Sequence, residues 1–121
     1  MQIEISNGEL LDKLSILEIK LEKIVDPGKL LNIQKEYRIL LGAAKVFISL
    51  EYYKILLEIN KELWEVEDRL RELEKEQKFD DSFISYARAV YRLNDRRAFI
   101  KKQINIETGS TLVEEKSYAS Y

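Results

Sequence analysis

Polar and charged residues recur at helical spacing along two segments of this chain, in a pattern that could perform chemistry. They follow one another every three or four positions within residues 50–77, and residues 81–107 repeat the arrangement. This set, called the polar ladder below, comprises Asn60, Trp64, Glu67, Arg71, Tyr91, Asn94, Asp95, Arg97, Lys101 and Asn105. In such a set arginine and lysine bind an anion, asparagine orients it, and glutamate accepts a proton. The ladder is therefore a candidate binding site for a small anionic metabolite such as a nucleotide or a sugar phosphate.

The same residues also have a structural interpretation. They flank an apolar stripe with alternating steps of four and three residues, formed by Tyr52, Leu56, Ile59, Leu63, Val66, Leu70 and Leu73. Polar groups beside a core are costly unless they are paired. Glu67 and Arg71 are four residues apart, which favours a salt bridge along the helix, and Trp64 would be a packed anchor. An interhelical hydrogen-bond network that fixes helix register is thus the competing hypothesis.

Acidic side chains raise the question of a metal ion. Glu67, Asp68 and Glu74, together with Glu9 and Asp12, offer hard oxygen ligands for Mg²⁺. All-helical pyrophosphatases that act on nucleoside triphosphates bind magnesium between helices in this way, but their doubled glutamate pattern is missing from this chain. The side chains of the adjacent Glu67 and Asp68 diverge by about 100° on a helix. No cofactor is therefore expected, with Mg²⁺ as the one alternative.

The composition excludes several kinds of chemistry. The 121 residues include no cysteine, so disulfides and thiolate metal sites are absent, and no histidine, the commonest general base. No stretch approaches the length of apolar sequence that a membrane-spanning helix needs, and the N-terminus does not resemble a signal peptide. We therefore expect a cytoplasmic protein that does not bind membranes. Its formal net charge of −2 gives no overall attraction to anionic surfaces.

Nucleic acid is a further partner to weigh, because residues 82–105 look basic in isolation. Their charged side chains are Arg88, Arg92, Arg96, Arg97, Lys101 and Lys102 against Asp95. Neighbouring aromatic residues could stack on bases. Acidic residues outnumber basic ones within residues 50–77, however, and an antiparallel hairpin would set the two segments side by side. We expect the opposite charges to pair across that hairpin, so nucleic acid is an unlikely partner.

Helix-start signals predict an all-α antiparallel bundle of about four helices that forms one domain over residues 1–121. Capping residues occur at Ser6, Asp26, Ser49 and Asp80, each next to an apolar residue that can pack across the first turn. They predict helices near 7–25, 27–47, 50–77 and 81–107, with Gly109 just past the last helix. Nothing before Ser49 breaks a helix strongly, so one continuous helix through this position is the alternative.

Helix lengths lead to an expectation about exposed apolar surface and association. The hairpin of the two longest helices should overhang the first helix, which would leave Leu70, Leu73 and Phe83 partly uncovered and favour a homodimer.

In the tail, Thr111 and Glu114 can form a capping box, and the nearby apolar residues can dock. The tail is therefore predicted to form a short final helix against the hairpin.

The order of these motifs resembles a family of small bacterial and phage proteins known only as a domain of unknown function. The resembling segments are Ser6 to Lys20, Asn60-x3-Trp64-x2-Glu67-Asp68, Asn94-Asp95-x-Arg97 and Glu114-Glu115-Lys116-Ser117-Tyr118. That family carries no established activity, so the resemblance transfers no catalytic role. It implies only a connection with sugar-related metabolism, because genes of such proteins tend to lie near glycosyltransferase genes. All-helical chorismate mutases offer a weaker analogy, and their residue order does not match this chain.

We therefore predict a dimeric helical interaction or accessory module with a polar interhelical site. A small enzyme or ligand-binding protein for an anionic metabolite, similar to a magnesium-dependent pyrophosphatase or a chorismate mutase, is the alternative. The two predictions differ in what the ladder residues contact: a network of paired groups in a dry interior favours structure, whereas unpaired donors in an open pocket favour a site.

Overall fold

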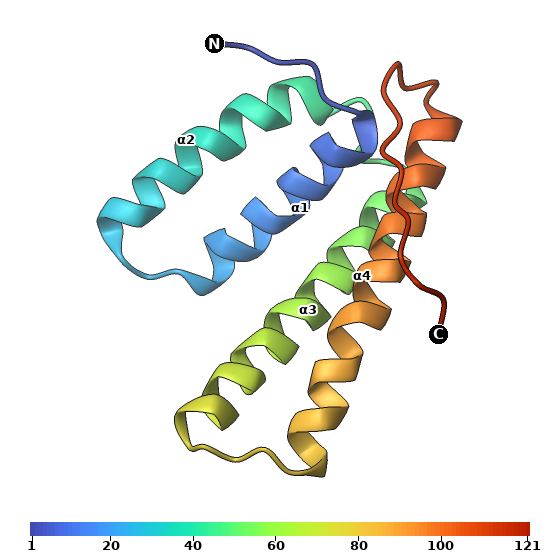
Figure 1. The fold of residues 1–121 in the computed structure, drawn as a ribbon. Helices are drawn as coiled ribbons and strands as arrows, with labels where there is room; N and C mark the ends of the chain where they lie inside the picture. The colour runs from blue at the N-terminus through green and yellow to red at the C-terminus, as the bar shows by residue number, and fades with distance from the viewer.

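Four helices arranged as two antiparallel hairpins make up the fold, and the predicted all-helical class is confirmed (Figure 1). The structure is a computed structural model that describes all residues, 1–121. The helices are α1 (Asn7–Lys23), α2 (Pro27–Ala44), α3 (Glu51–Lys75) and α4 (Asp81–Glu107). The hairpin of α3 and α4 is the longer one, and α1 lies between it and α2 (Figure 1).

Three of the four predicted helix caps are present. The side chains of Ser6, Asp26 and Asp80 each accept a hydrogen bond from a backbone amide in the first turn of their helix. The fourth prediction is wrong, because α3 is capped by Leu50 without a side-chain hydrogen bond and not by Ser49. Residues 45–50 form turns closed by backbone hydrogen bonds, which replace the missing cap and separate α2 from α3. The continuous-helix alternative is thereby excluded.

The core sits where the first turns of α1 meet the other three helices. Its buried residues are Leu10, Leu11, Leu14, Ala44, Leu56 and Ile104. A second cluster holds α3 against α4 through Ile59, Leu63 and Leu93. The apolar stripe predicted for α3 is therefore the inner face of that helix.

The long hairpin extends beyond α1 as predicted, but its end is covered differently (Figure 1). Leu73 is only 2% exposed, so the expectation that it is partly uncovered is wrong. The loop after α3 closes the end of the helix at this residue, with the amide of Lys78 donating to the carbonyl of Leu73 at 2.9 Å. Leu70 and Phe83 are half-buried, and the exposed apolar residues at the tip are Phe79 and Ile84.

The C-terminal tail docks along α4 but contains no helix, so the predicted final helix is wrong (Figure 1). Gly109, with φ +64°, ends α4 in a reversal closed by the amides of residues 109 and 110. Glu114, the expected capping-box partner of Thr111, lies 3.7 Å from Lys101 instead. Lys102 and Glu115 form a second ion pair at 3.0 Å. These pairs to α4 hold the tail extended.

Close approach of α1 to α4 explains one glycine and gives a first prediction. A methyl group on Gly8 would lie 2.4 Å from the backbone carbonyl oxygen of Lys101, whereas one on Gly42 would meet nothing within 4 Å. We expect Gly8→Ala to lower the free energy of unfolding by several kcal/mol, because two backbones must separate. Gly42→Ala, the matched control, should raise it by roughly 0.5–1 kcal/mol. Chemical denaturation of both variants checks this, and a stable Gly8→Ala protein would contradict the docking of α1.

A strained residue in the loop after α3 gives a second prediction. Gln77 has φ +56° and occupies the position that glycine prefers at a helix end. We expect Gln77→Gly to stabilise the protein by about 1 kcal/mol and to raise Tm by several degrees, because the left-handed conformation then costs little. Gln77→Ala keeps the strain and should not raise Tm; an equal rise in both variants in a thermal melt would argue against this conformation.

Candidate functional site

A carboxylate on α1 is the centre of the polar contacts that the fold creates. Asp12 is only 1% exposed and accepts hydrogen bonds from α4 and α3 together. Arg97 donates to both of its oxygens, through Nε at 2.8 Å to Oδ1 and through Nη2 to Oδ2. Asn60 donates through Nδ2 to Asp12 Oδ1 at 2.9 Å and to Ser15 Oγ at 2.7 Å. These four residues, the Asp12 cluster below, join three helices.

The cluster continues along α4 toward the start of α1. Lys101, only 8% exposed, donates to Glu9 Oε2 at 2.7 Å, and its Nζ lies 4.0 Å from Asp12 Oδ2. Asn105 accepts from the backbone amide of Gly8 at 2.7 Å. No buried side-chain nitrogen or oxygen lacks a hydrogen-bond partner. Four of the ten ladder residues, Asn60, Arg97, Lys101 and Asn105, therefore belong to a paired internal network, as the structural interpretation predicts.

Electrostatics keep the Arg97 guanidinium ionised. The hydrogen bonds from Arg97 to Asp12 raise the pKa of the guanidinium, and the attraction of the same carboxylate adds to the effect. Burial of the guanidinium opposes it. Since an arginine is already protonated at any pH at which proteins fold, Arg97 carries a fixed positive charge beside the buried Asp12.

The partners of α4 differ from those expected. Arg97 and Lys101 pair with α1, and Lys102 pairs with the tail. No ion pair within 4.0 Å joins α3 to α4, so the expectation that their charges pair across the hairpin is wrong. The contact of α3 with α4 is apolar, and charged residues of both helices, such as Glu62 and Arg96, line one groove between them without coming within 4.0 Å of each other.

Six ladder residues line a groove between α3 and α4 that α1 borders, and two of them, Asn60 and Arg97, also belong to the Asp12 cluster. The groove has a volume of about 430 Å³, and its lining residues are Ile16, Ile19, Asn60, Leu63, Trp64, Glu67, Asp68, Arg71, Asn94 and Arg97. Trp64 is half-buried, whereas the Arg71 side chain is 80% exposed. The expected pair of Glu67 and Arg71 is present at a separation of 3.9 Å. We call this feature the Trp64 groove.

The remaining ladder residues face the tail. Tyr91 and Asp95 line a separate pocket of about 490 Å³ that the tail borders. The ring of Tyr91 lies 5.1 Å from that of Tyr121, whose hydroxyl donates to Asp95. Asn94 lines both this pocket and the Trp64 groove. The ladder thus contributes to three places and does not form one site.

The sequence interpretation missed the role of α1. It gave Asp12 a role only as a possible metal ligand, and it gave Ser15 and Ile16, which belong to the resembling segment Ser6 to Lys20, no role in a site. A signal was present, because Asp12 and Ser15 are three residues apart and Ile19 follows four later, which is the spacing of a second inward face on α1.

The five acidic residues considered for Mg²⁺ are distributed over three places. Glu9 and Asp12 pair with Lys101 and Arg97, Glu67 and Asp68 lie in the Trp64 groove, and Glu74 lies farther along α3. No three side chains of the metal-ligating types Asp, Glu, His and Cys converge in a way that could hold an ion. No helix is both long and apolar enough to cross a membrane.

Comparison with known proteins places the chain in a family. A family model described as "Family of unknown function (DUF6165)" matches residues 1–121. The chain belongs to this family. The resemblance inferred from the motifs is thus confirmed at the level of a family without an assigned activity. No curated protein and no solved structure matches the chain. The DUF6165 match covers the Asp12 cluster, the Trp64 groove and the tail alike, since it extends over the whole chain.

Substitution of Arg97 tests whether the Asp12 cluster is structural. We expect Arg97→Met to lower the free energy of unfolding by about 3 kcal/mol, because it removes the bidentate partner of a buried carboxylate. The matched control is Arg38→Met on α2, where the exposed guanidinium contacts only its own helix, and it should change stability by less than about 0.5 kcal/mol. Urea denaturation measures both. An unchanged or more stable Arg97→Met protein would reassign Arg97 to a binding role.

Proposed function

We propose that this protein is a cytoplasmic interaction or accessory module that works as a homodimer and holds a helical segment of a partner protein in the Trp64 groove. The proposal needs no cofactor. The observation that carries it is the division of the polar ladder. Four ladder residues are used inside the fold, whereas Trp64, Glu67, Arg71 and Asn94 present an aromatic ring, both signs of charge and an amide to the groove.

The shape of the groove supports a protein segment as its occupant. A second hollow of about 400 Å³, lined by Leu70, Phe83 and Val90 among others, shares Glu67 and Arg71 with the Trp64 groove. The two hollows follow α3 from Asn60 to Glu74, a distance of about 21 Å at the helical rise. An elongated groove of this length suits several turns of helix better than a compact metabolite.

The chemistry of the groove supports the same occupant. Its apolar residues can cover the apolar stripe of an amphipathic helix, and its charged rim can fix the direction of that helix. Trp64 and Arg71 belong to the residue types that contribute most binding energy at protein interfaces. Both side chains extend from regular helices, so binding costs little conformational entropy of the backbone.

A second candidate function is the binding of a small anionic metabolite, and one observation favours it. Arg71 and Arg97 line the same hollow beside Asn94 and Glu67, the set from which the sequence suggested anion binding and proton transfer. Arg97 is already engaged by Asp12, which leaves it fewer donors for a phosphate. An enzyme that acts on a nucleotide or a sugar phosphate would use this same pocket.

Photo-crosslinking tests the first proposal. A photo-crosslinking residue replaces Leu70 in the groove or, as the control, Lys35 on the exposed side of α2. We expect position 70, but not position 35, to capture one protein in the cells of origin, and Glu67→Arg to weaken the capture. Capture that is equal at both positions, or insensitive to Glu67→Arg, would contradict a specific groove.

A melting-temperature screen tests the second candidate. Nucleotides, nucleotide sugars, sugar phosphates and Mg²⁺ are added singly, with the emission of Trp64, the sole tryptophan, as a local readout. A ligand at about 100 times its Kd stabilises by about 2.7 kcal/mol, which raises Tm by several degrees. For a peptide-binding groove we expect no shift. A shift that Arg71→Ala abolishes would establish the metabolite instead.

A further inference from the structure

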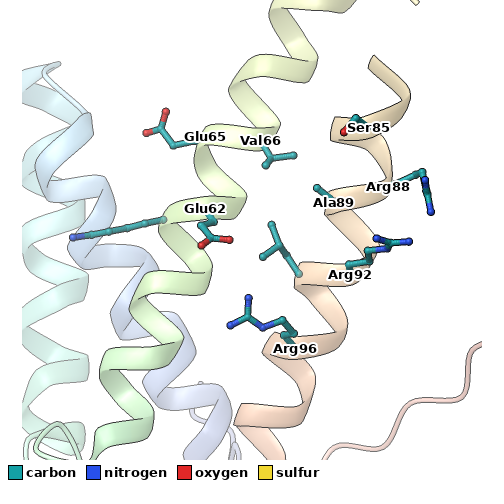
Figure 2. Close-up of a pocket in the computed structure, with 10 residues that line it drawn as sticks. Glu62, Glu65, Val66, Ser85, Arg88, Ala89, Arg92 and Arg96 are labelled. Carbon is teal, nitrogen blue, oxygen red and sulfur yellow. The ribbon is translucent and has the colours of Figure 1, made fainter. Parts of the chain in front are cut away.

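The side of the α3/α4 hairpin opposite the buried contact with α1 has no helix packed against it. Arg97, Lys101 and Asn105 point to α1, and at 100° per residue Arg92, Arg96 and Phe99 lie on the opposite side of α4. This side contains a groove of about 630 Å³ whose apolar lining is Val66, Ala89 and Leu93 (Figure 2). We call it the outer face.

The charged residues of the outer face are only partly paired. Lys61 and Glu65, which line its groove on α3, form ion pairs with Glu22 and Lys23 at the end of α1, whereas three arginines of α4 and two glutamates of α3 have no ion-pair partner in the chain. Arg88, Arg92 and Arg96 follow one another at one-turn intervals on α4, and none of them forms an ion pair within the chain. Figure 2 shows Arg88 and Arg92 pointing away from α3. On α3, Glu58 and Glu62 are likewise exposed without an ion pair.

Large apolar side chains extend the same face. Phe99 is 61% exposed and Ile106 is 62% exposed, and their spacing of seven positions places both on one side of α4. Exposed apolar side chains beside an apolar groove mark an interaction surface. The three arginines of α4 form a basic wall of this face, and Glu58 and Glu62 of α3 form an acidic wall. The occupant must therefore match apolar residues and both walls at once.

We infer that the outer face docks onto the outer face of a second copy, so that the basic wall on α4 of each chain meets the acidic wall on α3 of the other. An interface between identical copies must be complementary to itself, and a face with one basic and one acidic wall meets this condition. A polyanion would meet Glu58 and Glu62 as well as the arginines. The inference rests on the homodimer in the proposed function and names its surface.

The arrangement follows from the symmetry. A two-fold axis parallel to the hairpin keeps each residue at its own height and places α4 opposite α3 of the partner. Leu63 and Leu93 pack in one cluster, so Glu62 and Arg92 lie within about one turn of the same height. A two-fold axis perpendicular to the helices would set α4 against α4 and oppose like charges. The dimer is thus an antiparallel four-helix bundle of two hairpins.

The area is sufficient for a stable dimer. The 25 residues of α3 span about 38 Å, and two adjacent helices are about 20 Å wide, which gives a face of about 760 Å² for each copy. Specific protein interfaces bury about 800 Å² from each partner.

Charge reversal tests the arrangement on the full-length protein. One variant carries Arg92→Glu and Arg96→Glu, the other Glu58→Arg and Glu62→Arg, and analytical ultracentrifugation at micromolar concentrations gives the association state. We expect a wild-type dimer and a dimer Kd raised at least about 100-fold in each variant, because like charges then meet across the interface. An equimolar mixture of the two variants should restore the dimer, since both walls are complementary again. Arg38→Glu on α2, the control, should remain dimeric.

Other outcomes would overturn the inference. A wild-type monomer, a dimer that neither variant weakens, or a mixture that stays monomeric each excludes this pairing. A monomer that binds single-stranded DNA through Arg92 and Arg96 would assign the face to a polyanion. Circular dichroism shows whether the variants are folded, because the mixing experiment is informative only with folded chains. If charge reversal unfolds the protein, the variant with Arg92→Ala and Arg96→Ala removes the same charges with less disturbance and should still weaken the dimer. Crosslinking from position 70 in a monomeric variant separates failure of the dimer from failure of the partner groove.

Discussion

The burial of the Asp12 carboxylate constrains the whole arrangement of helices. A charged group that is 1% exposed destabilises a fold unless donors surround it, and here the donors come from α3 and α4 at once. Only one placement of α1 on the long hairpin brings Arg97 and Asn60 to the same carboxylate. The contact of Gly8 with the backbone of α4 belongs to that placement, because any side chain there would push α1 away.

The position of α1 decides which surfaces of the hairpin remain available. It covers one side of α4 from Arg97 to Asn105, and the tail contacts a second side through Lys102 and Asp95. Beyond the end of α1 the hairpin has no third helix, so the Trp64 groove runs on toward the hairpin tip. The outer face is open along its length. The Trp64 groove therefore extends toward the tip because α1 is much shorter than α3 and α4, whereas the outer face is open because α1 packs on the other side of the hairpin.

Local sequence signals made most of the fold predictable, whereas the ion-pair partners of the charged residues could not be predicted from them. Caps and apolar periodicity act within a few residues, and they located the starts of α1, α2 and α4 from Ser6, Asp26 and Asp80. Arg97 and Asp12 are 85 positions apart, and no local rule distinguishes Asp12 from the many glutamates of α3 as its partner. The prediction of a helix in the tail failed for the same reason, because Glu114 pairs with Lys101 of α4 and does not form a local capping box with Thr111.

The candidate site was predictable only in part because one periodic pattern served two purposes. Residues three and four apart on α4 share a face, but a face wide enough to carry Asn94, Arg97 and Lys101 contacts α1 at one end and borders a groove at the other. Spacing alone identifies the face and not where the neighbouring helix stops. That boundary separates the structural from the exposed ladder residues, and it follows from the length of α1.

In the proposed dimer the Trp64 groove lies on the side of the hairpin away from the partner chain, so each dimer would present two grooves. A partner with two helical segments would gain avidity from binding both.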